Sequence, residues 1–313
     1  MNLGYACINL GMSERPKKQR VTTNRSMIRR TFDQKGIPYA SELALQNCYD
    51  LEAIMEWNEA VGIRFFRLSS NIFPWASEYD LEDLPDWEQI KLSLQRTGQR
   101  AAAWGHRLTS HPGPFNKLAS DKEQVVLNTI KDLEIHGRIF DAIGLPRSPY
   151  AKLNIHVGAA YGNKPKALAT FNKNFQRLSD AVKSRLTVEN DDNNNLYSTQ
   201  ELYDGVYKVS GIPIVHDLHH HTFCTGGLSN ADALALAAST WGDIKPVVHY
   251  SQSRSEEKND TKIRKNAHSD SYWSAVDTFG HDVDVMLECK HKEIGLFKMR
   301  ELLNTKQYST QGA

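Results

Sequence analysis

Hydrophobic positions along the chain recur with two alternating spacings. Short runs rich in β-branched and aromatic residues predict strands, and a longer segment with apolar residues at helical spacing follows each one. The predicted strands cover residues 3–10, 63–70, 100–108, 151–158, 186–190, 212–217, 245–251 and 283–290. The predicted helices cover residues 41–62, 86–98, 121–144, 165–185, 198–211, 229–242, 271–280 and 293–303.

Strict alternation of strands and helices predicts an α/β fold with a parallel sheet. Eight such units favour a single (β/α)8 TIM barrel, which closes with roughly 250 residues and tolerates insertions. The alternative is an open doubly wound sheet, but no Gly-x-Gly-x-x-Gly motif follows the first strand. We expect one barrel domain over residues 1–303 and a frayed C-terminal tail over residues 304–313.

Composition excludes few classes of protein, but it indicates a cellular compartment. Lys and Arg number 38 against 37 Asp and Glu, so net charge does not indicate a partner. No apolar run approaches the roughly 20 residues of a membrane span, and the N-terminus lacks the basic start of a signal peptide. Free thiols are expected because no CxxC motif occurs. We expect a soluble, cytoplasmic protein with four unpaired cysteines, Cys7, Cys48, Cys224 and Cys289.

Side chains that can bind metals follow the predicted strands. Active sites of TIM barrels lie at the carboxyl ends of the strands, and six consecutive strand–helix units place a His, Asp or Glu there. These residues are His111 after the third strand, His156, Glu189 and Asp217 at the ends of the next three, His219–His221 just beyond, His249 and Glu288 at the last two, and His268 in the loop after the seventh.

One such residue alone is more often a hydrogen-bonded or half-exposed side chain than a ligand. Six units converging on one barrel mouth change that judgement, because crowded, buried carboxylates and imidazoles are costly unless they are paired. Divalent cations are natural partners of both groups. We expect two or three ions, an arrangement that can bind both the attacking and the leaving oxygen of a phosphodiester.

A basic segment follows the first predicted strand, on the same face as these residues. It contains no acid, and contact with phosphates is its expected role. The segment carries Arg15, Lys17, Lys18, Arg20, Arg25, Arg29 and Arg30.

Nine short motifs occur in an order that resembles the ultraviolet damage endonucleases. The resemblance covers nearly the whole chain, and the ordered set is specific although each motif alone is weak. It implies a barrel related to endonuclease IV that binds divalent metals, typically manganese, and incises DNA 5′ to ultraviolet photoproducts and some other lesions. The motifs are GYACINL, RLSSNIFP, SHPG, NIHVGAAYGNK, TVENDD, HDLHH, VHYS, AHSD and MLECKHKE.

The resemblance assigns roles to individual residues. Glu189, Glu288 and His111 would be the catalytic residues. Tyr5 and Asn9 would contact the lesion, and Phe115 would be the aromatic probe. The basic segment adds Lys17, Lys18, Arg20 and Arg25 to the expected DNA-binding residues. The implied metal ligands are His111, His156, Glu189, Asp217, His220, His249, His268 and Glu288.

Three positions depart from the family pattern. Pro114 precedes Phe115 where the family usually has Gln, so the probe would act by shape and stacking. Val247 stands where some members carry a modified lysine, which removes a lysine carboxylate as a ligand. Asn71 stands where some members have His or Asp.

Three histidines near Asp217 receive no ligand role. His216 should face away from Asp217, because neighbours on a strand point to opposite sides. His219 is a candidate for supporting or DNA contacts, and His221 for a solvated position.

Two other functions remain open from sequence. A two-metal sugar isomerase on the same barrel would explain the ligands but not the basic segment or the Phe115 loop. A damage-binding protein without catalysis would be favoured by loss of acidic ligands, but Glu189, Asp217 and Glu288 are present. The expected partner is double-stranded DNA with lesions. A monomer is expected because DNA must reach the open barrel mouth.

Overall fold

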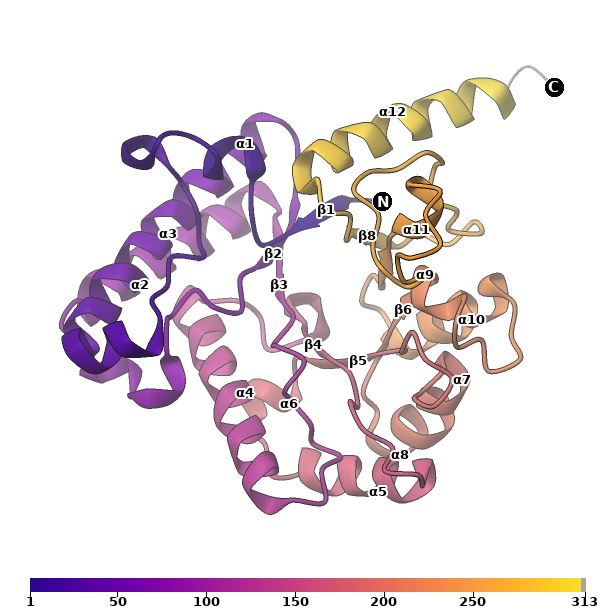
Figure 1. The fold of residues 1–313 in the computed structure, drawn as a ribbon, viewed down its shortest axis with the longest axis horizontal. Coiled ribbons are helices and arrows are strands. Elements are labelled where there is room, and N and C mark those ends of the chain that lie inside the picture. Colours follow the sequence, from indigo (N-terminus) through magenta and orange to yellow (C-terminus); the bar gives the residue numbers. More distant parts are fainter. Residues whose placement is uncertain (311–313) are drawn as a thin grey trace.

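Eight parallel strands form a closed barrel at the centre of the protein (Figure 1). The computed structural model describes the backbone of residues 1–310 and the side chains of residues 1–305. Each strand pairs with its neighbours in chain order, which confirms the predicted TIM barrel. The strands are β1 (Leu3–Ala6), β2 (Phe65–Leu68), β3 (Arg107–Ser110), β4 (Leu153–Ile155), β5 (Leu186–Glu189), β6 (Ile214–Asp217), β7 (Val247–Tyr250) and β8 (Asp284–Leu287).

Helices form the outer layer around the barrel (Figure 1). The longer ones are α2 (Arg29–Ala60), α3 (Trp87–Trp104), α4 (Glu123–Ile143), α5 (Lys164–Phe175), α10 (Asn230–Ala238) and α12 (Lys292–Thr310). The short ones are α1 (Leu10–Ser13), η1 (Lys17–Gln19), η2 (Ala76–Glu78), η3 (Leu81–Asp83), η4 (Pro149–Ala151), α6 (Asp180–Lys183), α7 (Thr199–Leu202), the π-helical η5 (Tyr203–Tyr207), α8 (Lys208–Ser210), α9 (Leu218–His221), η6 (Ser239–Trp241) and α11 (Arg254–Glu257).

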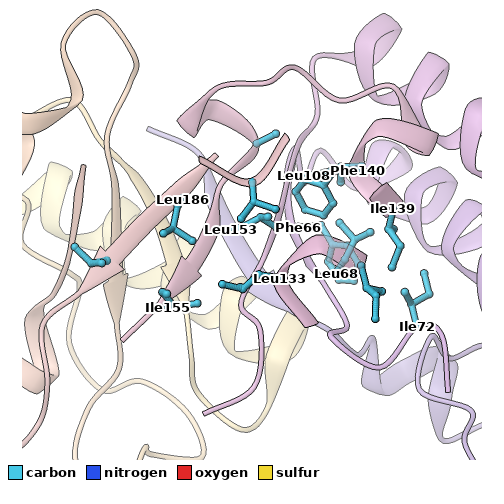
Figure 2. Close-up of a cluster of buried hydrophobic side chains, with 14 of the residues drawn as sticks. Phe66, Leu68, Ile72, Leu108, Leu133, Ile139, Phe140, Leu153, Ile155 and Leu186 are labelled. Carbon is cyan, nitrogen blue, oxygen red and sulfur yellow. The ribbon is translucent and has the colours of Figure 1, made fainter. Parts of the chain in front are cut away.

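Two hydrophobic clusters lie on the two faces of the strands. Alternate side chains of a strand point to opposite sides, so one set faces the helices and the other faces the barrel interior. Figure 2 shows part of the outer cluster, in which Phe66, Leu108 and Leu153 from strands lie near Ile139 and Phe140 of α4. The inner cluster contains Ala6, Phe65, Val215, Trp241, Val247 and Met286.

The third strand begins later than the sequence pattern indicated. Helix α3 continues through Gly98 to Trp104, and Gly105, with φ 69°, ends it. The sequence predicts a helix that ends at Gly98, but the role of this glycine is close packing. A Cβ atom built on Gly98 would lie 1.7 Å from the carbonyl oxygen of Ile143, at the end of α4.

Two helix predictions also need correction. The helix expected from residue 41 begins at Arg29 and bends where Gly36 adopts φ 62° and Pro38 follows. No helix forms over residues 271–280, because the surrounding structure binds the polar groups that a helix would use. The Trp273 amide donates to Gln252 Oε1 at 3.0 Å, for example, and the Val276 amide donates to Met299 Sδ at 3.4 Å.

The C-terminal helix extends beyond the predicted barrel boundary. Helix α12 includes residues 304–310, where a frayed tail was expected, and residues 311–313 lie outside the described part of the chain. Leu302 and Leu303 pack against the core and anchor this end of the helix. None of the described helices combines the length and apolarity needed to cross a membrane.

We predict that Gly98→Ala destabilises the protein by about 1–3 kcal/mol, because the added Cβ overlaps the Ile143 carbonyl and forces α3 from α4. Helix propensity alone would give the opposite sign, since alanine is favoured over glycine. Urea unfolding measures the difference, with exposed Gln99→Ala on the same helix as the control. Equal or greater stability of Gly98→Ala would refute close packing at this position.

Candidate metal centre

The barrel brings all eight predicted metal ligands to its carboxyl-terminal mouth. Six of them border or lie within the wall of one cavity of about 400 Å³, together with Asp191. The eight residues are His111 after β3, His156 after β4, Glu189 at the end of β5, Asp217 at the end of β6, His220 in α9, His249 in β7, His268 in the β7–β8 loop and Glu288 after β8.

Glu189 lies at the centre of this group and is only 1% exposed. Its Oε2 atom lies 3.2 Å from His111 Nε2, 3.0 Å from His249 Nδ1 and 3.9 Å from His156 Nε2. Its Oε1 atom lies 3.3 Å from His220 Nδ1. Four imidazoles from four different strand–helix units therefore surround one buried carboxylate.

The spacing of the donor atoms suits a shared divalent cation, and some of these atoms make no hydrogen bond with one another. Ligand atoms of Glu189, Asp217 and His249 all lie within 4.8 Å of one another, as do those of a second set containing His111, His156 and Glu189. Among the described residues, buried Asp217 Oδ2 and His249 Nδ1 make no hydrogen bond, although His249 Nδ1 lies close to carboxylates. Unpaired oxygen and imidazole donors facing a shared space suit a divalent metal.

Glu288 contributes another carboxylate to the centre, and its side chain is 12% exposed. Its Oε1 atom lies 3.2 Å from His249 Nδ1, and its Oε2 atom lies 3.9 Å from His268 Nδ1. Arg67 Nη1 in β2 forms an ion pair with it. Sequence reasoning missed Arg67, although its position two residues after Phe65 on the same strand was a signal that it faces the interior.

Two further polar contacts with the ligands were also missed. Asp191 Oδ1 lies 3.1 Å from His156 Nδ1, so this carboxylate can orient the imidazole. Asn154 Nδ2 donates to Glu189, and Thr187 Oγ1 donates to Asn154 Oδ1 at 2.8 Å. Asp191 lies in the TVENDD motif, where only the first acid was assigned.

Lys152 places an amine deep in the barrel beside the centre. It is fully buried, and its Nζ atom lies 3.0 Å from His249 Nε2, on the side of the ring away from Glu189 and Glu288. Burial lowers the pKa of Lys152 to about 7. Val247, which stands where some family members carry a modified lysine, belongs to the apolar interior cluster.

The surroundings of the histidines shift their pKa values in opposite directions. Burial lowers the pKa of His111 to about 4. Burial also opposes protonation of His156 and His220, but carboxylates outweigh it. Glu189 and Asp191 raise the pKa of His156 to about 10, while Asp217 and Glu189 raise that of His220 to about 9. Without a metal, these two imidazoles hold protons at neutral pH.

Three of the predicted DNA-binding residues are exposed cations, and one is not available. Lys17, Lys18 and Arg20 lie in and after η1, are exposed, and form no ion pair among the described residues. Arg25 instead forms an ion pair with the buried carboxylate of Asp50, so it anchors the segment to α2 rather than offering a free cation.

Tyr5 and Asn9 also occupy a different environment from the one expected. Tyr5 is fully buried on the outer face of β1, and its hydroxyl donates to Asn58 Oδ1 at 2.9 Å. Asn9 is 1% exposed and caps α1 by accepting from the Met12 amide at 3.0 Å. Neither side chain has a surface with which to contact a lesion, because strand alternation turns Tyr5 away from the mouth.

Phe115 has the exposure expected of a probe. It is 87% exposed in the loop after β3, and its neighbour Pro114 borders the metal cavity. This aromatic side chain therefore projects from the protein surface next to the ligands.

The unassigned histidines are mostly structural. His216 faces away from the centre as expected, 2.9 Å from Thr199 Oγ1 and 3.1 Å from Asn230 Oδ1. His221 was expected to be solvated, but it is 2% exposed and lies 3.0 Å from the Leu228 carbonyl. The short helix α9 turns this ring inward.

Comparison with known proteins decides the family. The family described as "UV-endonuclease UvdE" matches residues 1–311. This chain belongs to that family. It is 35% identical to a UV-damage endonuclease of Schizosaccharomyces pombe over 95% of this chain and 50% of the relative. It is 30% identical to a putative UV-damage endonuclease of Acanthamoeba polyphaga mimivirus over 96% of this chain and 90% of the relative.

Relatives differ in length, and the chain spans about half of the first fungal ones. Among solved structures, the crystal structure of SacUVDE superposes with a TM-score of 0.83 and 27% identity, covering 98% of this chain and 99% of that one. A D-psicose 3-epimerase from Clostridium cellulolyticum H10 gives a TM-score of 0.54 with 11% identity over 92% of this chain and 85% of that one. The likeness to the epimerase is one of fold alone.

We predict that manganese binding at pH 7 releases about two protons, because His156 and His220 must lose theirs to become ligands. Since both pKa values are raised, metal affinity should rise as the pH increases from 6 to 9. Calorimetry in buffers of different ionisation enthalpy counts the protons. His156→Gln should release about one proton fewer. A binding enthalpy independent of the buffer would contradict the protonated metal-free site.

Proposed function

We propose that this chain is a metal-dependent endonuclease that incises double-stranded DNA 5′ to ultraviolet photoproducts and other lesions. The observation that carries the proposal is the convergence of eight side chains that could bind metal at a barrel mouth that also exposes Phe115 and the cations in and after η1. Membership in the UvdE family supports the same activity. The cofactor would be two or three divalent ions, manganese in particular.

The carboxylates and imidazoles of the centre would hold these ions, which when bound supply Lewis acidity and lower the pKa of a coordinated water. Glu189 and Glu288 would hold the cations with their negative charge. Arg67 offsets part of the charge of Glu288 and fixes its orientation. His111, with its lowered pKa, stays neutral and keeps its ring nitrogen available beside Glu189.

Side chains around the centre would position the DNA. Lys17, Lys18 and Arg20 would bind backbone phosphates, which fixes the register of a duplex without reading its sequence. Phe115 would enter the base stack at a weakened step, where unstacking costs least, and so favour damaged over intact duplex. The enzyme would act as a monomer in the cytoplasm, associated with DNA.

We predict that the protein with manganese nicks ultraviolet-irradiated plasmid and spares unirradiated plasmid. Glu189→Gln should lower nicking by more than about a hundredfold, because it removes the carboxylate shared by four imidazoles. Its affinity for irradiated duplex should stay within about threefold of wild type. Glu42→Gln, an exposed acid on α2, is the matched control and should nick normally.

The nicking assay separates the candidate functions. Equal nicking of both plasmids would refute lesion specificity. Binding of irradiated DNA without nicking in any divalent metal would favour a damage-binding protein. Full activity of Glu189→Gln would show that the ligand set is wrong.

We predict that replacing Lys17, Lys18 and Arg20 together by Gln weakens binding to damaged and undamaged duplex alike. The slope of log affinity against log salt should decrease in magnitude by about 2–3, one unit per lost phosphate contact. The control replaces Lys173, Lys183 and Lys208, which lie in the last turns of helices at the opposite end of the barrel. An unchanged slope in the first variant, or an equal change in the control, would contradict phosphate binding by η1.

A further inference from the structure

Six residues other than glycine adopt a positive φ in the part of the chain that the structure describes. This conformation costs free energy in a residue with a Cβ atom, and such strain gathers at functional sites. Five of the six come fewer than ten residues after the end of a strand, toward the barrel mouth, whereas Phe279 comes shortly before β8. The six residues are Cys7, Trp75, Tyr161, Asn259, Phe279 and Lys292.

Tyr161 combines this strain with an exposed aromatic ring near the mouth. Its φ is 48°, and the residue is 55% exposed. Trp75 differs, because its indole donates to the Met27 carbonyl at 2.9 Å and its ring packs against the core. Internal packing therefore repays the strain at Trp75. An exposed ring gains little from the protein, so the strained conformation of Tyr161 points to a partner outside it.

The loop that carries Tyr161 lies between the metal centre and the loop of Phe115. It begins after β4, and Gly158 within it borders the cavity of the metal centre. A Cβ atom built on Gly158 would lie 3.2 Å from Lys117 Cγ. The Tyr161 hydroxyl donates to Ser120 Oγ at 3.4 Å. Since Lys117 and Ser120 belong to the loop after β3, Tyr161 and Phe115 project from two loops that touch.

Tyr161 also lines a cavity of about 210 Å³ between these two loops and α5. Lys166, in the first turn of α5, lines the same cavity, is exposed and forms no ion pair among the described residues. Asp121 borders the cavity as well but does not pair with this lysine. An aromatic face beside a free cation suits one nucleotide, because the base can stack on the ring and a phosphate can contact the cation.

We propose that Tyr161 stacks on a base of the damaged strand beside the lesion, and that Lys166 binds a phosphate of the same strand. The inference rests on the proposed function, since it requires lesion DNA at the metal centre. In an intact duplex, neighbouring bases cover both faces of every base, so the ring finds no free face. A lesion that weakens pairing and stacking frees such a face. Tyr161 would therefore help to discriminate damaged from intact duplex.

The test measures single-turnover nicking of a duplex with one defined photoproduct, with excess enzyme and manganese. The enzyme concentration at half-maximal rate reports affinity for damaged duplex, and competition by unirradiated duplex reports affinity for intact DNA. Tyr161→Asn removes the ring and relieves the strain, because asparagine tolerates a positive φ. Tyr161→Phe keeps the ring and removes only the hydroxyl.

Phe279→Asn is the matched control. Phe279 has a φ of 50° and is 42% exposed, so it shares the strain and the exposed ring of Tyr161. It lies at the opposite end of the barrel, three residues before Asp282, which pairs with the N-terminal amine.

Tyr161→Asn should need about tenfold more enzyme to reach its half-maximal rate, because stacking on one base is lost, while its maximal rate stays within about threefold of wild type. Its affinity for intact duplex should stay within about twofold. Tyr161→Phe should match wild type within about twofold. Both Asn variants should raise the Tm by about 1–3 °C through relief of strain. Phe279→Asn should nick normally.

Lys166→Gln tests the phosphate contact separately. The slope of log affinity for damaged duplex against log salt should decrease in magnitude by about one, the value for one lost phosphate contact. An unchanged slope would refute the role of Lys166.

Four outcomes for the Tyr161 variants would overturn the stacking role while leaving the proposed function intact. One is an affinity of Tyr161→Asn for damaged duplex within about twofold of wild type, and another is an equal loss toward damaged and intact duplex. A third is an equal loss in Tyr161→Phe, which would assign the effect to the hydrogen bond with Ser120. A lowered Tm of Tyr161→Asn would contradict the strain argument. If wild type fails to discriminate damaged from intact duplex, the proposed function itself is refuted and the inference falls with it.

Discussion

The burial of the Glu189 carboxylate is the constraint on which the site depends. A carboxylate that is 1% exposed is stable only if positive or hydrogen-bonding groups surround it. His156 and His249 hold the pKa of Glu189 well below its usual value despite burial, and Asn154 donates a hydrogen bond to it. A bound cation would take over this role and displace the protons. A metal ion and the protons on the surrounding imidazoles would therefore compete to stabilise the Glu189 carboxylate.

The barrel interior separates two charged layers. At the mouth, Arg67 pairs with Glu288. At the other end, Arg107 is fully buried and its Nη1 atom lies 3.2 Å from Asp284 Oδ2. Met286 of the inner cluster follows Asp284 and precedes Glu288 by two residues each, so it lies between the two pairs. The ion pair of Arg107 and Asp284 fixes the strands away from the mouth, whereas the pair at the mouth lies among the candidate metal ligands. The same strand alternation thus serves stability at one end and chemistry at the other.

The fold could be predicted because strand and helix periodicities differ, and eight alternating units leave few alternatives. The errors arose where contacts between distant segments override local signals. Gly98 marks a helix end by sequence but allows α3 to approach the Ile143 carbonyl in the structure. Residues 271–280 have a helical pattern, yet backbone amides such as that of Val276 donate to side chains of distant segments instead of to a helix.

The convergence of the candidate ligands could be predicted because strand ends must converge in a barrel, so position along the chain determines position in space. The supporting residues could not, because nothing local in the sequence distinguishes the buried amine of Lys152 from a surface lysine. The residues expected to contact DNA divide by the same principle. Phe115 lies in a loop whose exposure follows from its place at the mouth, whereas Tyr5 lies within a strand, where one step of register decides between mouth and core. Prediction from sequence is therefore most secure for side chains placed by topology and least secure for those placed by packing.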